Sequence, residues 1–334
     1  MESEPPRESE WRHDYLTDRK VIIAGNRSNR PGAYSQKMSF ESIARCPFCH
    51  GNEADSPLQL HRARLKNSRT DWDVRVVTNL YPALEASSVK GYGRHEVVIE
   101  AASHTTQFAG LSPEQIFLVS QVWQERLKEL SQVSGIKDIL LFKNNGPAAG
   151  ASLQHIHSQI LAMDLVPASK KLELAQALAY WKANAGKNYF THWREEETMV
   201  AHRVITDGSF FSFCPYASRA PYEICILPRR VQPFFTGVDP EELLELSVLL
   251  KDLLEALGRN LNDPDYNLVL HQSPVQAGVL PYYSWRLEII PRLTVEAGFE
   301  LGTGYAINSM PPELAAQQIR EWLSNAQETK IPLV

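Results

Sequence analysis

The chain has 334 residues, of which 43% are hydrophobic and 22% are charged, and its net charge is −5 at pH 7. This size and composition are typical of a soluble globular protein with one large core or two smaller ones. The small acidic excess gives no reason to expect nucleic acid or an anionic membrane as a partner. Four cysteines are too few for a disulfide framework in a chain of this length.

The first ten residues are acidic and polar and contain no apolar core. We therefore expect no signal peptide. No apolar run approaches the roughly 20 residues that a membrane-spanning helix needs. These features predict a soluble cytoplasmic protein.

Two short motifs follow a predicted strand at residues 21–24. Arg27 and Arg30 lie in a polar turn, where two guanidinium groups can either face solvent or bind phosphate. Cys46 and Cys49 form a Cys-x-x-Cys pair, whose spacing suits two thiolates on one tetrahedral metal ion. A redox role is the alternative, but no helical pattern follows the pair. There is no second pair of this spacing, so histidines or carboxylates from elsewhere would complete a metal site.

The next part of the chain predicts strands and one helix in a fixed order. Strands are expected at 74–77, 96–100 and 138–142. Between the second and third of these, an amphipathic helix runs from 113 to 130, with Ser112 as its N-cap and proline at its first position.

A loop of glycine and alanine at residues 146–151 then leads into a strand in which His155, His157 and Gln159 alternate with other residues. Because side chains alternate along a strand, these three are expected on one face. Small residues in the loop let backbone N–H groups approach an anion. Together the loop and the strand predict a phosphate-binding site.

The order of strands and helix occurs a second time. The second series has predicted strands at 222–227, 266–270 and 285–290 and a helix that begins at Asp239-Pro240. A supersecondary unit that is used twice gives such a repeat. The second series lacks the histidines of the first, so we expect one active centre per chain.

The repeat divides the chain into two halves. Residues 1–165 hold the cysteine pair and the histidine strand, and residues 206–334 hold the second series. Residues 166–205 connect the halves and include a predicted helix from 168 to about 185.

These features together resemble the galactose-1-phosphate uridylyltransferase family, a branch of the histidine-triad superfamily. The resemblance covers nearly the whole chain. It rests on the cysteine pair, the basic turn, the duplicated layout and the residues Asn79, His104, Gly150, Ser152, His155, His157 and Gln159. It implies an α+β fold of two tandem histidine-triad-like halves, each an antiparallel sheet with packed helices.

The resemblance implies covalent chemistry at His157, which would attack the α-phosphorus of a nucleotide-sugar and give ping-pong kinetics. Gln159 and Ser152 would bind the phosphoryl oxygens. Related hydrolases carry a third histidine where Gln159 stands, and an amide cannot shuttle protons as imidazole does, so transfer is favoured over hydrolysis. The other implied substrate-binding residues are Arg27, Arg30, Asn79, Asn144, Gly146 and Gly150.

The resemblance also implies one structural zinc ion per chain, with the ligands Cys46, Cys49, His104 and His155. Four protein ligands leave no open position for substrate. A second metal site, which some family members build in the second half, is expected to be lost. There Arg286 stands among Glu173, His271 and Glu288, and its cation would repel a metal ion.

Two segments in which the chain differs from the galactose enzymes bear on the choice of substrate. Leu80 replaces an acidic residue after Asn79, and residues 298–304 lack the usual charged contacts to the hexose phosphate. Both segments look like those of plant-type ADP-glucose phosphorylases, which pass adenylyl from ADP-glucose to phosphate.

The leading prediction is a UDP-glucose:hexose-1-phosphate uridylyltransferase of galactose metabolism that uses galactose-1-phosphate. The alternative is an ADP-glucose phosphorylase. Two hypotheses belong to another functional class: a hydrolase of nucleotide conjugates and a non-catalytic nucleotide-binding protein. The family further implies a homodimer, in which the basic turn reaches the active site of the neighbouring subunit.

Overall fold

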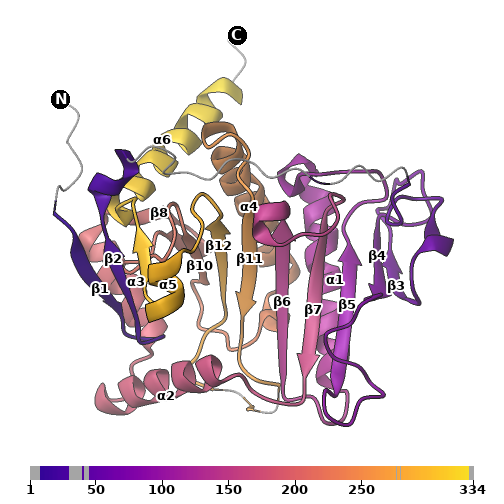
Figure 1. Cartoon of the computed structure of the whole chain (residues 1–334), viewed down its shortest axis with the longest axis horizontal. Coiled ribbons are helices and arrows are strands. Elements are labelled where there is room, and N and C mark those ends of the chain that lie inside the picture. The colour runs from indigo at the N-terminus through magenta and orange to yellow at the C-terminus, as the bar shows by residue number, and fades with distance from the viewer. Residues whose placement is uncertain (1–7, 30–39, 41–44, 276, 279, 331–334) are drawn as a thin grey trace.

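The computed structural model describes residues 8–29, 40, 45–275, 277–278 and 280–330. Its centre is a ten-stranded sheet whose neighbouring strands are all antiparallel (Figure 1). In spatial order the strands are β3 (Gln59–Ala63), β4 (Val74–Thr78), β5 (Gly93–Ile99), β7 (His157–Met163), β6 (Asp138–Asn145), β11 (Tyr266–His271), β12 (Arg286–Pro291), β10 (Ile224–Pro228), β9 (Phe210–Phe213) and β8 (Val204–Asp207).

The strand order confirms that one series of elements is used twice. The order β3-β4-β5-β7-β6 on one side of the sheet is mirrored by β11-β12-β10-β9-β8 on the other. The prediction of a separate sheet for each half is wrong, because β6 and β11 pair from Asn145↔Tyr266 to Leu141↔Leu270. An unpaired strand edge leaves N–H and C=O groups without partners, and this pairing removes two such edges.

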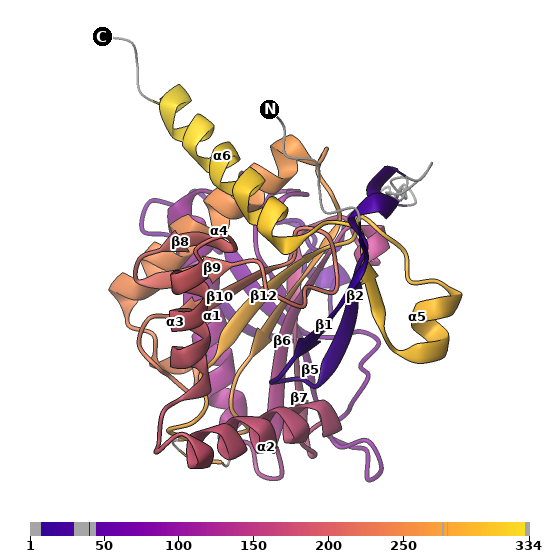
Figure 2. The same cartoon turned by 90° about the vertical axis from the view of Figure 1, so that its left-hand side faces the viewer.

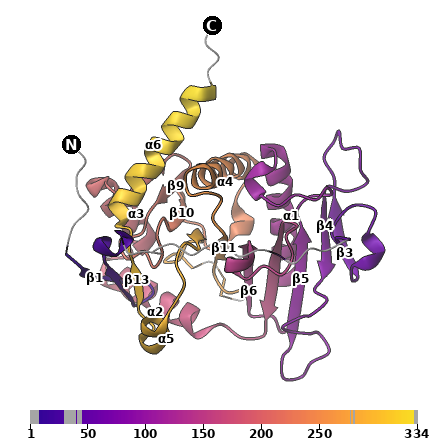
Figure 3. The same ribbon diagram turned by 45° about the horizontal axis from the view of Figure 1, so that its top comes forward.

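Two long helices, α1 (Pro113–Ser131) and α4 (Pro240–Asn260), lie side by side along the back face of the sheet (Figure 3). Both begin where the sequence predicts. Ser112 accepts a hydrogen bond from the N–H of Gln115 (3.2 Å), and Asp239 forms a capping box with Glu242. The helix α6 (Pro312–Lys330) packs on α4, and all three contribute to the largest hydrophobic core.

The front face of the second half is covered by other elements. A second core there joins α2 (Ala168–Ala183) and α3 (Tyr189–Val200) to β9 and β10. The hairpin of β1 (Glu10–Asp14) and β2 (Arg19–Ile23) pairs with β13 (Ala306–Asn308) and lies, with α5 (Gly298–Thr303), on the side opposite α1 and α4 (Figure 2). The short 3₁₀ helices are η1 (Gly25–Asn29), η2 (Glu53–Asp55), η3 (Phe108–Gly110), η4 (Pro147–Ala149) and η5 (Phe235–Gly237).

The helix predicted from 168 to about 185 is α2, which ends at Ala183. Within the described residues, none of the helices is both long and apolar enough to cross a membrane.

A buried ion pair joins Lys143 of β6 to Glu100, which follows β5. The ammonium of Lys143 donates to the Glu100 carboxylate and, at 3.1 Å, to the backbone carbonyl of His157. Both side chains are fully buried. Burial lowers the pKa of Lys143 and raises the pKa of Glu100, and in each case the partner's charge opposes the shift.

Removing the cation of this pair leaves the Glu100 carboxylate buried without an opposite charge. We expect Lys143→Met to lower the free energy of unfolding by about 3–5 kcal/mol. The double variant Lys143→Met/Glu100→Leu removes both charges and should recover most of that loss. Urea unfolding of the three proteins measures both effects, and a single variant as stable as the wild type would contradict the expectation.

Candidate active site and metal centre

The predicted histidine strand is shorter than expected. The strand β7 begins at His157, and His155 lies in a bend just before it. The expectation of one shared strand face is therefore right for His157 and Gln159 and wrong for His155. The bend frees the His155 ring to turn toward the cysteine pair.

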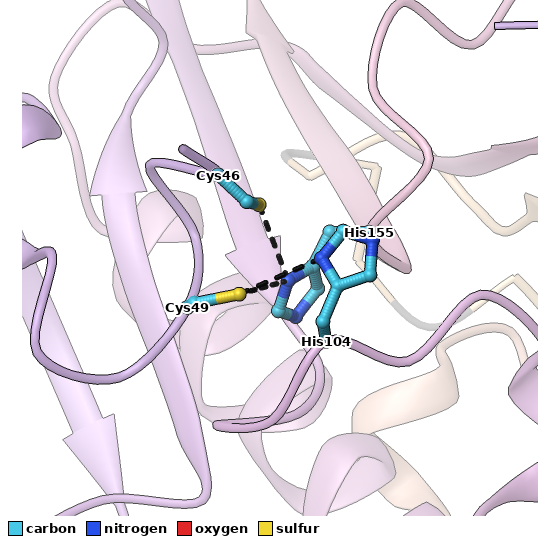
Figure 4. A group of neighbouring side chains, drawn as sticks. All are labelled: Cys46, Cys49, His104 and His155. Carbon is cyan, nitrogen blue, oxygen red and sulfur yellow. Dashed lines mark hydrogen bonds between the residues drawn. The ribbon is translucent and has the colours of Figure 1, made fainter. Parts of the chain in front are cut away.

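Cys46, Cys49, His104 and His155 converge from three separate segments of the chain (Figure 4). The sulfur of Cys46 lies 3.5 Å from Nδ1 of His155, and the sulfur of Cys49 lies 3.5 Å from Nδ1 of His104. The Cys49 sulfur is also 3.7 Å from Nδ1 of His155. All four ligand atoms lie within 4.8 Å of one another.

These distances fit a tetrahedral zinc ion. Zinc–sulfur bonds of about 2.3 Å and zinc–nitrogen bonds of about 2.05 Å at a tetrahedral angle separate sulfur from nitrogen by about 3.6 Å. The Nε2–H of His155 donates to the carbonyl of Ala101 (2.9 Å), so Nδ1 is the nitrogen with a free lone pair. The cluster is therefore consistent with a structural zinc site.

The chemistry of the two thiols points the same way. Burial, together with the neighbouring Cys46 sulfur, raises the pKa of Cys49 to about 11. Two adjacent thiolates repel each other, and a divalent cation is what allows both to be deprotonated at neutral pH. The pair lies in turns rather than at the start of a helix, which removes the structural basis for a thioredoxin-like redox role.

The cysteine segment is packed against the front face of the first half. Phe48, between the two cysteines, joins a core with Trp72 and Val77. Its ring also contacts those of His155 and His157, with centroids 6.1 and 5.5 Å away. The metal cluster and the candidate nucleophile are therefore parts of one packed unit.

The hydrogen bond of His157 fixes which ring nitrogen is available. Its Nδ1–H donates to the backbone carbonyl of His155 (2.8 Å), so Nε2 is unprotonated in the neutral ring. Burial lowers the pKa of His157 to about 4, and the nearby Lys143 cation acts in the same direction. The side chain is thus a neutral imidazole with Nε2 free to act as a nucleophile.

His95 is a site residue that the sequence analysis missed. The N–H of Ala83 donates to its Nδ1 (3.1 Å), so the hydrogen is on Nε2, which donates to the side-chain oxygen of Gln159 (2.9 Å). The NH₂ group of Gln159 then remains as a donor for substrate. The contact depends on the pairing of β5 with β7, which puts Val97 opposite Gln159, and no local sequence pattern indicates it.

The glycine–alanine loop does not have the predicted open row of N–H groups. The N–H groups of Ala149 and Ala151 both donate to the carbonyl of Gly146, at 3.2 and 3.1 Å. The N–H of Gly150 donates to the carbonyl of Pro147, at 3.0 Å. The N–H of Ala148 donates to the carboxylate of Asp265 (2.6 Å). Four consecutive N–H groups are thus already bonded, so anion binding here depends on side chains.

The other predicted substrate-binding residues lie in different surroundings. Asn144 is on β6, and Ser152 is exposed in the loop before β7. The side-chain oxygen of Asn79 accepts from the N–H of Tyr81 (2.8 Å), and its nitrogen is 3.3 Å from Nε2 of His95.

Arg27 of the basic turn borders a cavity of about 530 Å³ that is otherwise lined mostly by residues of the second half. Arg27 lines it together with three other arginines, Arg19, Arg219 and Arg292. Arg30 lies outside the described residues.

In the second half, the Arg286 guanidinium lies among the residues for which the loss of a second metal site is predicted. Arg286 donates to Glu173 and, at 3.0 Å, to Glu288, which His271 approaches to 3.2 Å. Although burial raises the pKa of Glu173, the charges of Arg286 and His271 hold it at about 2. The carboxylates are thus already neutralised, which supports the prediction of no second metal.

The comparisons with known proteins agree with this fold. Residues 59–167 match the family model for the N-terminal domain of galactose-1-phosphate uridyl transferase. An ADP-glucose phosphorylase of Arabidopsis thaliana is 34% identical over 93% of this chain and 92% of its own. A galactose-1-phosphate uridylyltransferase of Thermotoga maritima is 28% identical over 93% of this chain and 98% of its own.

A crystal structure of an Arabidopsis thaliana ADP-glucose phosphorylase with bound ADP-glucose has a TM-score of 0.82 to this chain. It is 34% identical, and the match covers 94% of this chain and 99% of that one. The fold is thus that of a family of nucleotidyltransferases. The chain belongs to the galactose-1-phosphate uridylyltransferase family, which confirms the resemblance drawn from the sequence.

The metal cluster gives a direct test. Protein purified without chelators should contain about one zinc ion per chain, because the four ligands form one closed tetrahedral site. Cys49→Ser should lose zinc and unfold at a lower temperature, whereas Cys225→Ala, a buried cysteine outside the cluster, should keep its zinc. Elemental analysis and thermal unfolding measure the two effects. Absence of stoichiometric zinc from the wild type would contradict the site.

Proposed function

We propose that the protein transfers a nucleotidyl group from a nucleotide-sugar to a phosphorylated acceptor through a covalent nucleotidyl-His157 intermediate. The observation that carries this proposal is the hydrogen bond from Nδ1 of His157 to the His155 carbonyl, which leaves Nε2 unprotonated beside Gln159. A buried neutral imidazole needs no deprotonation before it attacks.

In the first step, the Nε2 lone pair of His157 attacks the α-phosphorus. The P–N bond forms as the bond from that phosphorus to the bridging oxygen breaks, and the sugar 1-phosphate leaves. In the second step, an oxygen of the acceptor phosphate attacks the same phosphorus and the P–N bond breaks, which restores the neutral imidazole. The NH₂ group of Gln159, oriented by His95, and the side chains of Asn144 and Ser152 would stabilise charge on the phosphoryl oxygens.

A zinc ion held by the cysteine–histidine cluster would act on the protein rather than on the substrate. Bound zinc supplies a fixed link between the cysteine segment and the residues just before β7. The packing of Phe48 against both histidines then transmits that order to the His157 ring.

For the substrate, we favour ADP-glucose with phosphate as the acceptor over UDP-glucose with galactose-1-phosphate. The support is the 34% identity to an ADP-glucose phosphorylase over nearly the whole chain, compared with 28% for the galactose enzyme of Thermotoga maritima. Leu80 and residues 298–304 give independent support, since both differ from the galactose enzymes. Hexose-1-phosphate uridylyltransferase remains the second candidate.

We further propose that residues 1–165 and 206–334 are histidine-triad-like domains joined by residues 166–205, and that the protein is a homodimer. Exposed apolar side chains support the dimer, because contiguous apolar surface marks sites of association. One set lies around β1 and α5 and another beside Asn79; the residues are Trp11, Val295, Phe299, Leu301, Tyr305, Leu80 and Tyr81. Association of the two surfaces would bring the arginine-lined cavity of one protomer to the active site of the other.

Intact mass spectrometry identifies the covalent step and the base. Incubation with ADP-glucose should give an adenylyl adduct, and UDP-glucose should give much less uridylyl adduct. His157→Ala should form neither, whereas His192→Ala, a histidine on α3 outside the site, should match the wild type. A dominant uridylyl adduct would favour the galactose reaction. Full transfer activity in His157→Ala would rule out the covalent mechanism.

The residue at position 159 tests the choice of transfer over hydrolysis. General acid–base assistance is worth roughly 10²–10⁴ in rate, and an imidazole at this position can give such help to water. We therefore expect Gln159→His to raise release of free nucleotide by at least about tenfold in the absence of acceptor. Gln159→Ala, which has no side chain to move a proton, serves as the control. Equal hydrolysis by both variants would show that the third position does not set the outcome.

A further inference from the structure

Two residues of the second half hold the loop of the first-half site. Asp265 lies just before β11, and Asn267 is its second residue. The pairing of β6 with β11 puts Asn267 directly opposite Asn144. The hydrogen bonds that Asp265 and Asn267 make with residues 144–149 therefore cross the junction between the two halves.

Asn267 fixes the amide of Asn144. Its Nδ2 donates to the side-chain oxygen of Asn144 (2.8 Å) and to the backbone carbonyl of Ala149 (2.9 Å). Because the Asn144 oxygen is used as an acceptor, the Asn144 NH₂ group is oriented away from Asn267. That nitrogen is 3.6 Å from the position that a Cβ on Gly150 would take, so the amide lies against the loop.

Asp265 fixes the start of the same loop. Its carboxylate accepts from the N–H of Ala148, and a Cβ on Gly146 would lie 2.0 Å from its Oδ1. Gly146 also has a φ of +87°, a conformation that side chains disfavour. The glycine that sequence reasoning assigns to phosphate binding is therefore required by the approach of Asp265.

We propose that Asp265 and Asn267 are positioning residues for nucleotidyl transfer. They clamp residues 146–150 so that the Asn144 amide and the loop are preformed for the phosphoryl group attacked by His157. The second half, which has no histidine motif, thus sets the geometry of the site in the first half. The catalytic part of this inference rests on the proposed function. The structural part rests on the hydrogen bonds alone.

Four substitutions distinguish the effect of losing the clamp from the effect of a general loss of stability. Asn267→Asp keeps the shape but cannot donate to Asn144 or Ala149, and misplacement of a reacting group by about 1 Å costs about 10²-fold in rate. We expect a fall of about that size in the rate of adduct formation. Asp265→Ala should also slow the step, whereas Asp265→Asn keeps an acceptor for the Ala148 N–H and should stay near the wild type.

The matched control is Asp239→Ala, which also removes a carboxylate that accepts from a backbone N–H, but at the start of α4. It should lower the unfolding midpoint and leave the kinetics of the folded enzyme unchanged. Hydrogen exchange of the peptide that contains residues 146–151 gives a readout independent of activity. Those amides should be protected in the wild type and exchange faster in Asn267→Asp and Asp265→Ala.

Wild-type rates of adduct formation and unchanged exchange in Asn267→Asp would overturn the clamp. So would losses in adduct formation that only follow stability, as in Asp239→Ala. If the wild type forms no adduct with ADP-glucose or UDP-glucose, the proposed function fails. The exchange result then decides the structural part of the inference by itself.

Discussion

The main-chain pairing of β6 with β11 is the interaction on which the site depends. It joins two repeated halves into one sheet and fixes Asn267 opposite Asn144. A shift of this pairing by one residue would turn every front-face side chain of β11 to the helices. Such a shift is opposed by the buried residues of β11, such as Leu268 and Leu270, which belong to the large core. Core packing thus sets the geometry of polar contacts on the opposite face.

Backbone carbonyls determine which ring nitrogen carries the hydrogen in each of the two histidines, His155 and His157. Ala101 accepts from Nε2 of His155, and the carbonyl of His155 accepts from Nδ1 of His157. A carbonyl can only accept, so each contact determines the ring nitrogen that keeps its lone pair. For His155 that nitrogen faces the cysteines, and for His157 it is the nitrogen proposed to attack phosphorus. Two residues of the same type, two positions apart, thereby suit two different kinds of chemistry.

Local signals in the sequence predicted the parts of the fold and site that depend on local chemistry. Helix starts at Ser112 and Asp239 follow from capping, and the metal cluster follows from ligand types joined to a family resemblance. The role of His95, the clamp by Asp265 and the bonded state of the loop N–H groups were not predictable in this way. The first two depend on strand register or on contacts between residues more than 60 positions apart, which sequence periodicity does not indicate. The loop N–H groups bond mostly to carbonyls within the loop itself, through turns that periodicity does not indicate either. The bend at His155 was missed because strand alternation alone does not mark where a strand begins.

Each half contains a cluster of side chains that can carry negative charge, and the two halves differ in the cation that suits the cluster. In the first half, a cluster of cysteines and histidines fits a zinc ion that would neutralise its sulfurs. In the second half, Arg286 supplies the positive charge to Glu173 and Glu288, and Arg219, at 2.5 Å from Glu288, adds another. A guanidinium bonds in a fixed fork and needs no ligand from solution. Arg219, which Glu288 and Glu223 hold, lines the arginine-lined cavity. Arg286 is therefore a permanent internal cation of the second half, in the region that positions Arg219. Through β11, the second half also pairs with the half proposed to carry the covalent chemistry.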